Sequence, residues 1–248
     1  MIVFNLYNME AHKTYTSKTV GEIVAEDYRK AKVFRSYGID FCCGGGKLLE
    51  DIISNKKIDL EQILGELHQV DQSDSELDQT NFDELTLEDL SEYIVSKHHT
   101  YTKETMEQIL PLINKVARVH GDWKAELVKI NNHFISLHTE LTTHMMKEEN
   151  VLFPYIVQLS RGLVAESPFG SIEYPIKNME LEHDVAGDLI LRIEELSDNY
   201  TLPEGACNSY TVVYKLLREF QDDLMQHIHL ENNILFPKAA LLEKQLKN

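Results

Sequence analysis

Two stretches of eleven residues, far apart in the chain, repeat one design. Residues 144–154 read HMMKEENVLFP and residues 227–237 read HIHLENNILFP, with His, Glu, Asn, Leu, Phe and Pro at the same six positions. In each stretch His and Glu stand four residues apart, so a helix would carry both side chains on one face. The chain must therefore fold so that two helices can accommodate such ionisable pairs.

The faces that carry these pairs are otherwise apolar. Apolar residues recur at steps of three and four along three segments, which is typical of the buried face of a helix. His and Glu thus occupy predicted core positions on three helices. The predicted inward faces are Ile130, Phe134, Leu137, Leu141, His144, Glu148 and Val151; Ile176, Met179, His183, Ala186, Ile190 and Ile193; and Val213, Leu217, Phe220, Leu224, His227, Glu231 and Ile234.

Helical periodicity dominates the chain from residue 85 to residue 248, and no stretch shows the alternation of a strand. Loops rich in Pro and Gly separate four long patterns, which predicts an all-α protein with an antiparallel four-helix bundle. Three prolines within these patterns should kink a helix or mark its last turns. The four predicted helices cover residues 86–119, 122–160, 172–197 and 207–246, and the prolines are Pro111, Pro154 and Pro237.

Residues 14–70 form a predicted small helical domain in front of the bundle. Thr19 begins a capping-box sequence and a helix that Gly38 can end, and Asp59 is a suitable N-cap for a later helix. Residues 71–84 are acidic and poor in apolar side chains, which is typical of a linker.

Composition excludes several classes of function. A net charge of −17 over 248 residues argues against binding to nucleic acid or to an anionic membrane. No apolar run approaches the roughly 20 residues of a membrane span, and the N-terminus lacks the features of a signal peptide. Three cysteines do not make a disulfide framework. We therefore expect a cytoplasmic protein.

Burying a polar group in a protein core without a hydrogen-bonding partner costs on the order of 1–3 kcal/mol of stability. A hydrogen-bonded network of His and Glu is one solution, and a metal is the other, because imidazole and carboxylate are both good ligands. The first bundle helix offers His98 and His99, and periodicity does not decide between them. Its heptad relation to Met106 and Ile113 favours His99.

The sequence offers more candidate ligands than the four that one tetrahedral zinc ion binds. Four His and two Glu suit two metals, with both carboxylates bridging, two terminal His on each metal, and room for an oxo or hydroxo bridge. Nitrogen and oxygen donors without thiolate favour iron or manganese. The order His-x-x-x-Glu also differs from the Glu-x-x-His of ferritin-like bundles. The predicted ligands are His99, His144, Glu148, His183, His227 and Glu231.

Cys42 and Cys43 form a second candidate site, in the glycine-rich sequence CCGGGK. Adjacent cysteines rarely meet disulfide geometry. They precede a predicted helix, whose dipole can lower a thiol pKa, so one hypothesis is a reactive pair that handles iron, NO or electrons. The alternative is a tight turn in which the thiols only pack. Cys207 is expected to be ordinary.

Other ionisable residues near the predicted ligands are expected to have lesser roles. Glu182 could line an access path or accept a proton, as could Glu140, but a solvated face is favoured for both. Glu149 should point away from its neighbour Glu148. His229 should face solvent, and His98 should be partly exposed or lie behind a ligand.

Taken together, these motifs resemble the hemerythrin-like di-iron bundles, and more closely the iron–sulfur cluster repair family. Residues 144–154, 230–237 and Glu180–Gly187 are similar to that family's bundle motifs, as is Lys115–Gly121. Phe41–Lys47 resembles the cysteine motif of its N-terminal domain. Hemerythrins proper use a further His four residues after His183, where this chain has Gly187. The resemblance covers nearly the whole chain.

The resemblance implies a cytosolic protein with two iron ions that restores iron–sulfur clusters damaged by nitric oxide or oxidants. Such a protein would act by donating iron or by removing NO. Its partners would be damaged iron–sulfur proteins, and its small ligands would be NO or O2. It also implies the six ligands named above, with His99 rather than His98, and a homodimer. The alternatives are a sensor or store of O2, NO or iron, an NO reductase or peroxidase, and a purely structural bundle without metal.

Overall fold

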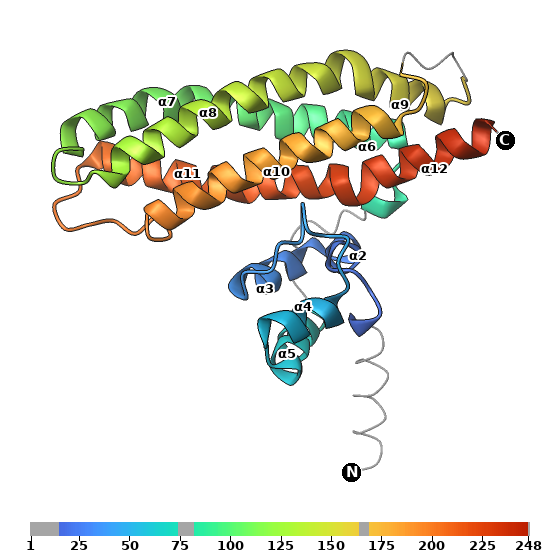
Figure 1. Cartoon of the computed structure of the whole chain (residues 1–248), viewed down its shortest axis with the longest axis horizontal. Helices are drawn as coiled ribbons and strands as arrows, with labels where there is room; N and C mark the ends of the chain where they lie inside the picture. The colour runs from blue at the N-terminus through green and yellow to red at the C-terminus, as the bar shows by residue number, and fades with distance from the viewer. Residues whose placement is uncertain (1–14, 74–81, 164–168, 248) are drawn as a thin grey trace, which may run out of the picture. The chain divides into compact units, whose positions relative to one another are not determined.

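The computed structural model describes residues 15–73, 82–163 and 169–247 (Figure 1). In these ranges the chain is helical, and its one strand-like feature is an isolated bridge between Thr19 and Leu48. The predicted all-α class is therefore confirmed. The N-terminal stretch, residues 74–81 of the predicted linker and residues 164–168 of a predicted loop lie outside the described residues.

The chain divides into two compact units, Thr86–Ile228 with Lys238–Asn248, and Met1–Leu85 with His229–Pro237. The first unit holds the long helices, apart from His229–Pro237 in the last of them, and these helices lie side by side along one axis (Figure 1). Their four stretches are α6 (Leu87–Tyr93), η3 (Ile94–His99) and α7 (Thr100–His120); α8 (Glu126–Lys147), η4 (Glu148–Leu152) and α9 (Phe153–Ser160); α10 (Glu173–Leu196); and α11 (Asn208–Leu230), η5 (Glu231–Leu235) and α12 (Phe236–Lys247).

Packing between these helices follows the predicted inward faces. Helix α8 packs against both α7 and α10. It also contacts α11, where the rings of Phe134 and Phe220 meet edge to face with their centroids 6.0 Å apart. The apolar residues of the predicted faces are buried, with one exception in α8–η4, described next. The four-helix bundle predicted from periodicity is thus present.

Three π-helical turns, η3, η4 and η5, interrupt the α-helices. Each contains a predicted ligand, because η3 ends at His99, η4 begins at Glu148 and η5 begins at Glu231. A π-turn holds more residues than an α-turn and so shifts the face that follows it. The prediction that Val151 faces inward is therefore wrong: Val151 is 47% exposed, and Leu152 is buried in its place.

Two of the prolines stand directly after π-turns. Pro154 and Pro237 are the second residues of α9 and α12, and both helices continue beyond them. Proline lacks the N–H that an α-helix interior requires, so a wider turn just before it accommodates the missing bond. Pro111 lies inside α7, which continues to His120.

The second unit contains the short helices α2 (Val20–Glu26), η1 (Tyr28–Lys30), α3 (Ala31–Ser36), α4 (Leu49–Lys56), α5 (Leu60–Asp71) and η2 (Phe82–Glu84). Thr19 and Glu22 form the expected capping box, and Asp59 caps α5. The expectation of one helix from Thr19 to Gly38 is wrong. Asp27 takes an extended conformation and caps η1 through its carboxylate, which breaks the helix. Within the described residues, no helix combines the length and apolarity required to cross a bilayer.

Candidate metal centre

Four histidines and two glutamates meet in the interior of the bundle. They form two groups of buried side chains, and within each group the donor atoms lie within 4.8 Å of one another. Both groups contain Glu148 and Glu231, so the carboxylates are common to the two groups while the imidazoles are not. One group adds His99 and His227, and the other adds His144 and His183.

Glu148 shows most directly how the two groups are joined. Its Oε1 lies 3.2 Å from Nε2 of His144, and its Oε2 lies 3.4 Å from Nε2 of His99. Each carboxylate oxygen thus faces an imidazole of a different group. Within the groups, the Nε2 atoms of His99 and His227 are 3.1 Å apart, and those of His144 and His183 are 3.0 Å apart.

The chemistry of this donor set fits metal cations. Imidazole nitrogens and carboxylates are crowded together at side chains that are at most 3% exposed. Two carboxylates would be costly as uncompensated charges in such a place, whereas divalent cations neutralise them and accept the imidazole lone pairs. Since the groups contain nitrogen and oxygen donors and no sulfur, they suit iron or manganese better than a metal that prefers thiolates.

The structure separates His98 from His99. Both are buried, but only His99 belongs to a donor group. Nδ1 of His98 lies 3.0 Å from Oδ1 of Asp223, and its ring stacks on that of His227 with the planes 9° apart. His98 is 1% exposed, so the expectation of partial exposure is wrong, and its ring lies against that of a candidate ligand.

Two carboxylates hold candidate ligands from behind. Nδ1 of His99 lies 2.8 Å from Oε1 of Glu149, and Nδ1 of His144 lies 2.9 Å from Oε2 of Glu182. An Nδ1–H that donates to a carboxylate leaves the Nε2 lone pair free for a metal. A lysine completes each arrangement, Lys103 at Glu149 and Lys147 at Glu182.

These contacts correct two expectations. Glu149 does not point away from the site, and Glu182 is not simply a solvated residue. The hydrogen bond from His144 lowers the pKa of Glu182 to about 2, against the opposing effect of burial and with help from Lys147. Burial raises the pKa of Glu149, but hydrogen bonds from Lys103 and His99 outweigh it and leave that pKa below its usual value. Both carboxylates are therefore ionised at neutral pH.

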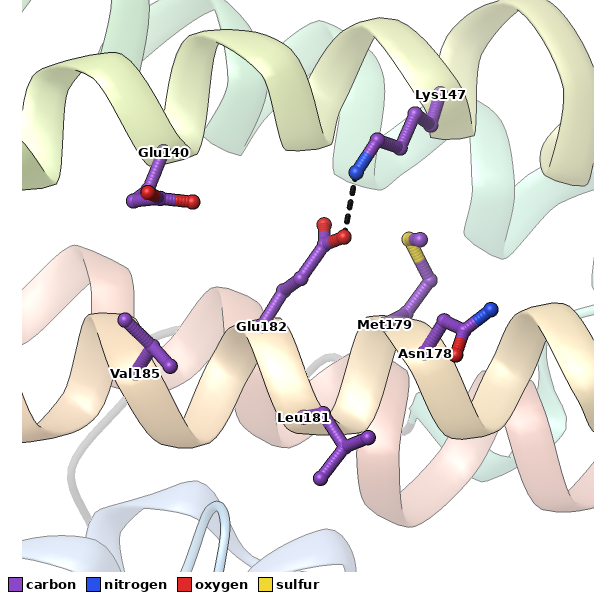
Figure 2. A pocket seen from close by; sticks show the side chains of 7 residues that line it. All are labelled: Glu140, Lys147, Asn178, Met179, Leu181, Glu182 and Val185. Carbon is purple, nitrogen blue, oxygen red and sulfur yellow. Dashed lines mark hydrogen bonds and ion pairs between the residues drawn. The ribbon is translucent and has the colours of Figure 1, made fainter.

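A pocket of about 430 Å³ opens beside Glu182, between α8 and α10 (Figure 2). Figure 2 shows the Glu182 carboxylate reaching across from α10 to the Lys147 ammonium on α8. Glu182 thus connects this pocket to His144 by a hydrogen bond. Glu140 lines the same pocket. Glu140 and Glu182 are the two residues that could line an access path to the site. The lining residues are Glu140, Lys147, Asn178, Met179, Leu181, Glu182 and Val185.

Cys42 and Cys43 lie in the N-terminal unit, and all three cysteines of the chain are free. Helix α4 begins at Leu49, so neither cysteine lies in its first turn, where the helix dipole acts. The expected lowering of a thiol pKa is wrong for Cys42. A hydrogen bond with Cys43, burial and the Asp40 carboxylate raise the pKa of Cys42 well above its usual value.

Two further histidines depart from surface positions. His229, which was expected in solvent, is 1% exposed and lies against the rings of Tyr28 and Phe41. Burial lowers the pKa of His229 to about 4, so it is neutral at physiological pH. Nε2 of His120 lies 3.2 Å from Sγ of Cys207, which gives that cysteine a partner in the bundle unit. Neither contact has a signal in helical periodicity.

Comparison with known proteins gives matches to both parts of the chain. Residues 90–239 match the hemerythrin HHE cation-binding domain, and residues 16–71 match the domain of unknown function called ScdA_N. The chain is 33% identical over 226 residues to a probable iron–sulfur cluster repair protein of Haemophilus influenzae, covering 91% of this chain and 98% of that protein. It is 37% identical over 226 residues to the iron–sulfur cluster repair protein YtfE of Pectobacterium atrosepticum, covering 91% and 97%. It is 36% identical over 225 residues to the YtfE protein of Escherichia coli O17:K52:H18, again covering 91% and 97%.

Proposed function

The chain belongs to the iron–sulfur cluster repair family, and from this premise we propose that its bundle holds two iron ions that serve the repair of clusters damaged by nitric oxide or oxidants. The observation that carries the proposal is the pair of buried donor groups with two shared carboxylates. A purely structural bundle would have no use for this crowding of ionisable groups in its interior.

In this proposal Glu148 and Glu231 would contribute to both iron sites, because both donor groups contain them. His99 and His227 would hold one ion, and His144 and His183 would hold the other. Bound iron would supply redox chemistry and affinity for NO.

The surrounding side chains keep the ligands in a state that can bind a cation. Glu149 and Glu182 accept the Nδ1 protons of His99 and His144 and so fix the orientation of both rings. Glu182 also lines the solvent-accessible pocket, and its low pKa keeps it an acceptor for the Nδ1 proton of His144. The apolar residues of the bundle core exclude bulk water from the donors.

Two routes to repair are compatible with this site. In one, iron is the cargo and leaves the bundle for a damaged client. In the other, the bound iron would stay in the bundle and supply affinity for NO. Two imidazoles and two carboxylates per ion resemble the open nitrogen and oxygen ligand sets of non-haem iron sites more than a closed thiolate site. We propose damaged iron–sulfur proteins as the partners. A cytoplasmic location is proposed because the three cysteines are free, and a homodimer from the family resemblance.

Reactivation of an iron–sulfur enzyme that NO has inactivated tests the proposal. The iron-loaded protein should restore activity, and the double variant Glu148→Gln with Glu231→Gln, treated in the same way, should not. Protein loaded with isotopically labelled iron separates the two routes, because donation puts the label into the repaired cluster. No restoration above buffer and free iron would contradict a repair role. Many turnovers of NO to N2O with an electron donor would instead favour a reductase.

A further inference from the structure

A second set of potential metal donors lies in the N-terminal unit, in the turn formed by residues 40–45. One carboxylate oxygen of Asp40 and the sulfur atoms of Cys42 and Cys43 lie within 4.8 Å of one another. Cys42 is 4% exposed, Cys43 is partly exposed and Asp40 is exposed, so the group opens to solvent on one side. None of these residues belongs to the His and Glu groups of the bundle.

Backbone hydrogen bonds hold Asp40 in place before any ion arrives. Its Oδ1 accepts from the N–H of Cys42 at 3.0 Å and from that of Cys43 at 3.1 Å, and its Oδ2 accepts from the N–H of Gly44 at 2.8 Å. Oδ2 accepts one such bond, and a carboxylate oxygen has room for two partners, so it can still coordinate a cation. A Cβ at Gly44 would lie 3.0 Å from Oδ2, which makes glycine the best fit there.

Asn233 holds the same turn through its other surface. Its side-chain N–H donates to the carbonyls of Cys42 at 3.0 Å and of Phe41 at 3.3 Å. A Cβ at Gly45 would lie 2.2 Å from the side-chain oxygen of Asn233, so only glycine allows this close approach. The turn is thus fixed on both sides while its donors converge, as a preformed binding site requires.

The spacing of the two sulfur atoms suits a shared ion better than a disulfide. They are 4.0 Å apart, about twice the 2.05 Å of a disulfide bond. Two thiolates that each lie about 2.3 Å from one tetrahedral ion are separated by roughly 3.8 Å, close to the observed spacing. The Cys42 thiol also donates to Oδ1 of Asp40 at 3.3 Å, so sulfur and carboxylate already face one another.

The charge of the group also suits a cation. A divalent ion would compensate the negative charge of two thiolates and a carboxylate, and it would displace the thiol protons on binding.

We propose that Asp40, Cys42 and Cys43 bind one divalent cation of the zinc and ferrous class, distinct from the ions of the bundle. Three protein ligands leave a fourth position open, as in sites that exchange a ligand or pass on their ion. Thiolate donors give this site a preference for softer metals than the nitrogen and oxygen donors of the bundle. The inference goes beyond the proposed repair function and stands or falls separately from it.

Cobalt(II) is the probe that separates this site from the bundle, since only a thiolate ligand produces an intense sulfur-to-cobalt charge-transfer band. Titration of the reduced full-length protein should produce that band and saturate at one cobalt per chain. Cys43→Ser and Cys42→Ser should weaken the band and lower the affinity at least tenfold. Asp40→Asn keeps its acceptor oxygen but loses the charge, and should lower the affinity about tenfold.

Cys207→Ser is the matched control, because Cys207 is exposed and remote in sequence, and it should leave the band unchanged. A second readout counts thiols that react with a chromogenic reagent under native conditions. Because Cys42 is buried and should react little even without an ion, excess zinc should protect Cys43 in the natural chain and should protect no thiol in Cys43→Ser. Circular dichroism establishes whether each variant folds, and Cys43→Ser alone suffices if Cys42→Ser does not. Absence of the band, or a band that survives Cys43→Ser, would overturn the proposal.

Discussion

Residues 144–154 and 227–237 place the same residue types at the same offsets, yet their surroundings differ. Their inward faces are alike, because His144 and Glu148 in one copy, and His227 and Glu231 in the other, join the same pair of donor groups. Both copies also widen into a π-turn at the Glu and resume an α-helix before the Pro. The shared residues thus correspond to a shared backbone irregularity and a shared site.

Their outward faces diverge. Asn150 donates to a carbonyl of its own helix, whereas Asn233, at the same offset, donates to the carbonyls of Phe41 and Cys42. Met146 is 60% exposed, whereas His229, at its offset, is 1% exposed. One copy therefore carries an ordinary solvated surface, and the other belongs to the N-terminal unit. The comparison teaches that a repeated motif fixes the chemistry of its inner face and leaves the outer face free for another role.

The largest effect should come from the two shared carboxylates. Glu148→Gln and Glu231→Gln each keep size and shape but remove one charge from both donor groups. We expect each variant to lose both ions with an affinity loss of more than about 100-fold, beyond the 10–100-fold typical of residues behind the ligands. Iron per chain after dialysis measures this. Loss of one ion only, or unequal effects of the two variants, would break the equivalence of the copies.

Substitutions at the residue one turn after each Glu should affect the free energy of unfolding differently in residues 144–154 and in residues 227–237. Val151 is 47% exposed and Ile234 is 1% exposed, although they share an offset. Ile234→Ala should cost about 2–4 kcal/mol of unfolding free energy through lost burial and a cavity. Val151→Ala should stay within about 0.5 kcal/mol. Urea unfolding of the two variants measures the difference, and equal costs would mean that the two positions do not differ in burial as described.

The carboxylates behind the imidazoles should have an intermediate effect. Glu149→Gln and Glu182→Gln each weaken the orientation of one imidazole, so affinity for iron should fall about 10–100-fold. Glu140→Gln is the control, since Glu140 lines the same pocket as Glu182 but is exposed to solvent. Competition with a chelator of known affinity gives the values. A similar loss in all three variants would point to a general effect of surface charge instead.

The smallest effect should appear at the outward face of residues 227–237. Asn233→Ala removes the bonds to Phe41 and Cys42 and should cost about 1–2 kcal/mol, whereas Asn150→Ala should cost within about 0.5 kcal/mol. Gly45→Ala should resemble Asn233→Ala because its Cβ meets Asn233, while a Cβ at Gly46 has nothing within 4 Å. Amide hydrogen exchange of residues 41–45 reports the loosening. Unchanged exchange in Gly45→Ala would contradict the close approach.

Periodicity predicts much of the bundle because long amphipathic helices record their buried face in sequence. The four predicted helices agree with the structure to within one residue at every end but one, since α8 begins at Glu126 and not at residue 122, and the predicted inward face that contains His183 is buried as expected. Cap residues were equally informative at Thr19 and Asp59, because a cap is a local interaction.

The wrong predictions have a different cause, because they concern residues whose surroundings depend on backbone irregularities or tertiary contacts. Val151 was misplaced because the π-turn at Glu148 breaks the period on which the prediction rested. Glu149 and His229 were misplaced because their partners, His99 and Phe41, lie on remote segments of the chain. His98 and His99 could not be separated by spacing because both fall within the irregular turn η3 and both are buried.

Metal analysis of the full-length protein purified without added metal, together with its optical spectrum, tests the central claim most directly. The account predicts two irons per chain and the absorption of an oxo-bridged pair, both lost in Glu148→Gln with Glu231→Gln. A folded natural protein that carries no metal, or that binds a single ion without such absorption, would contradict it.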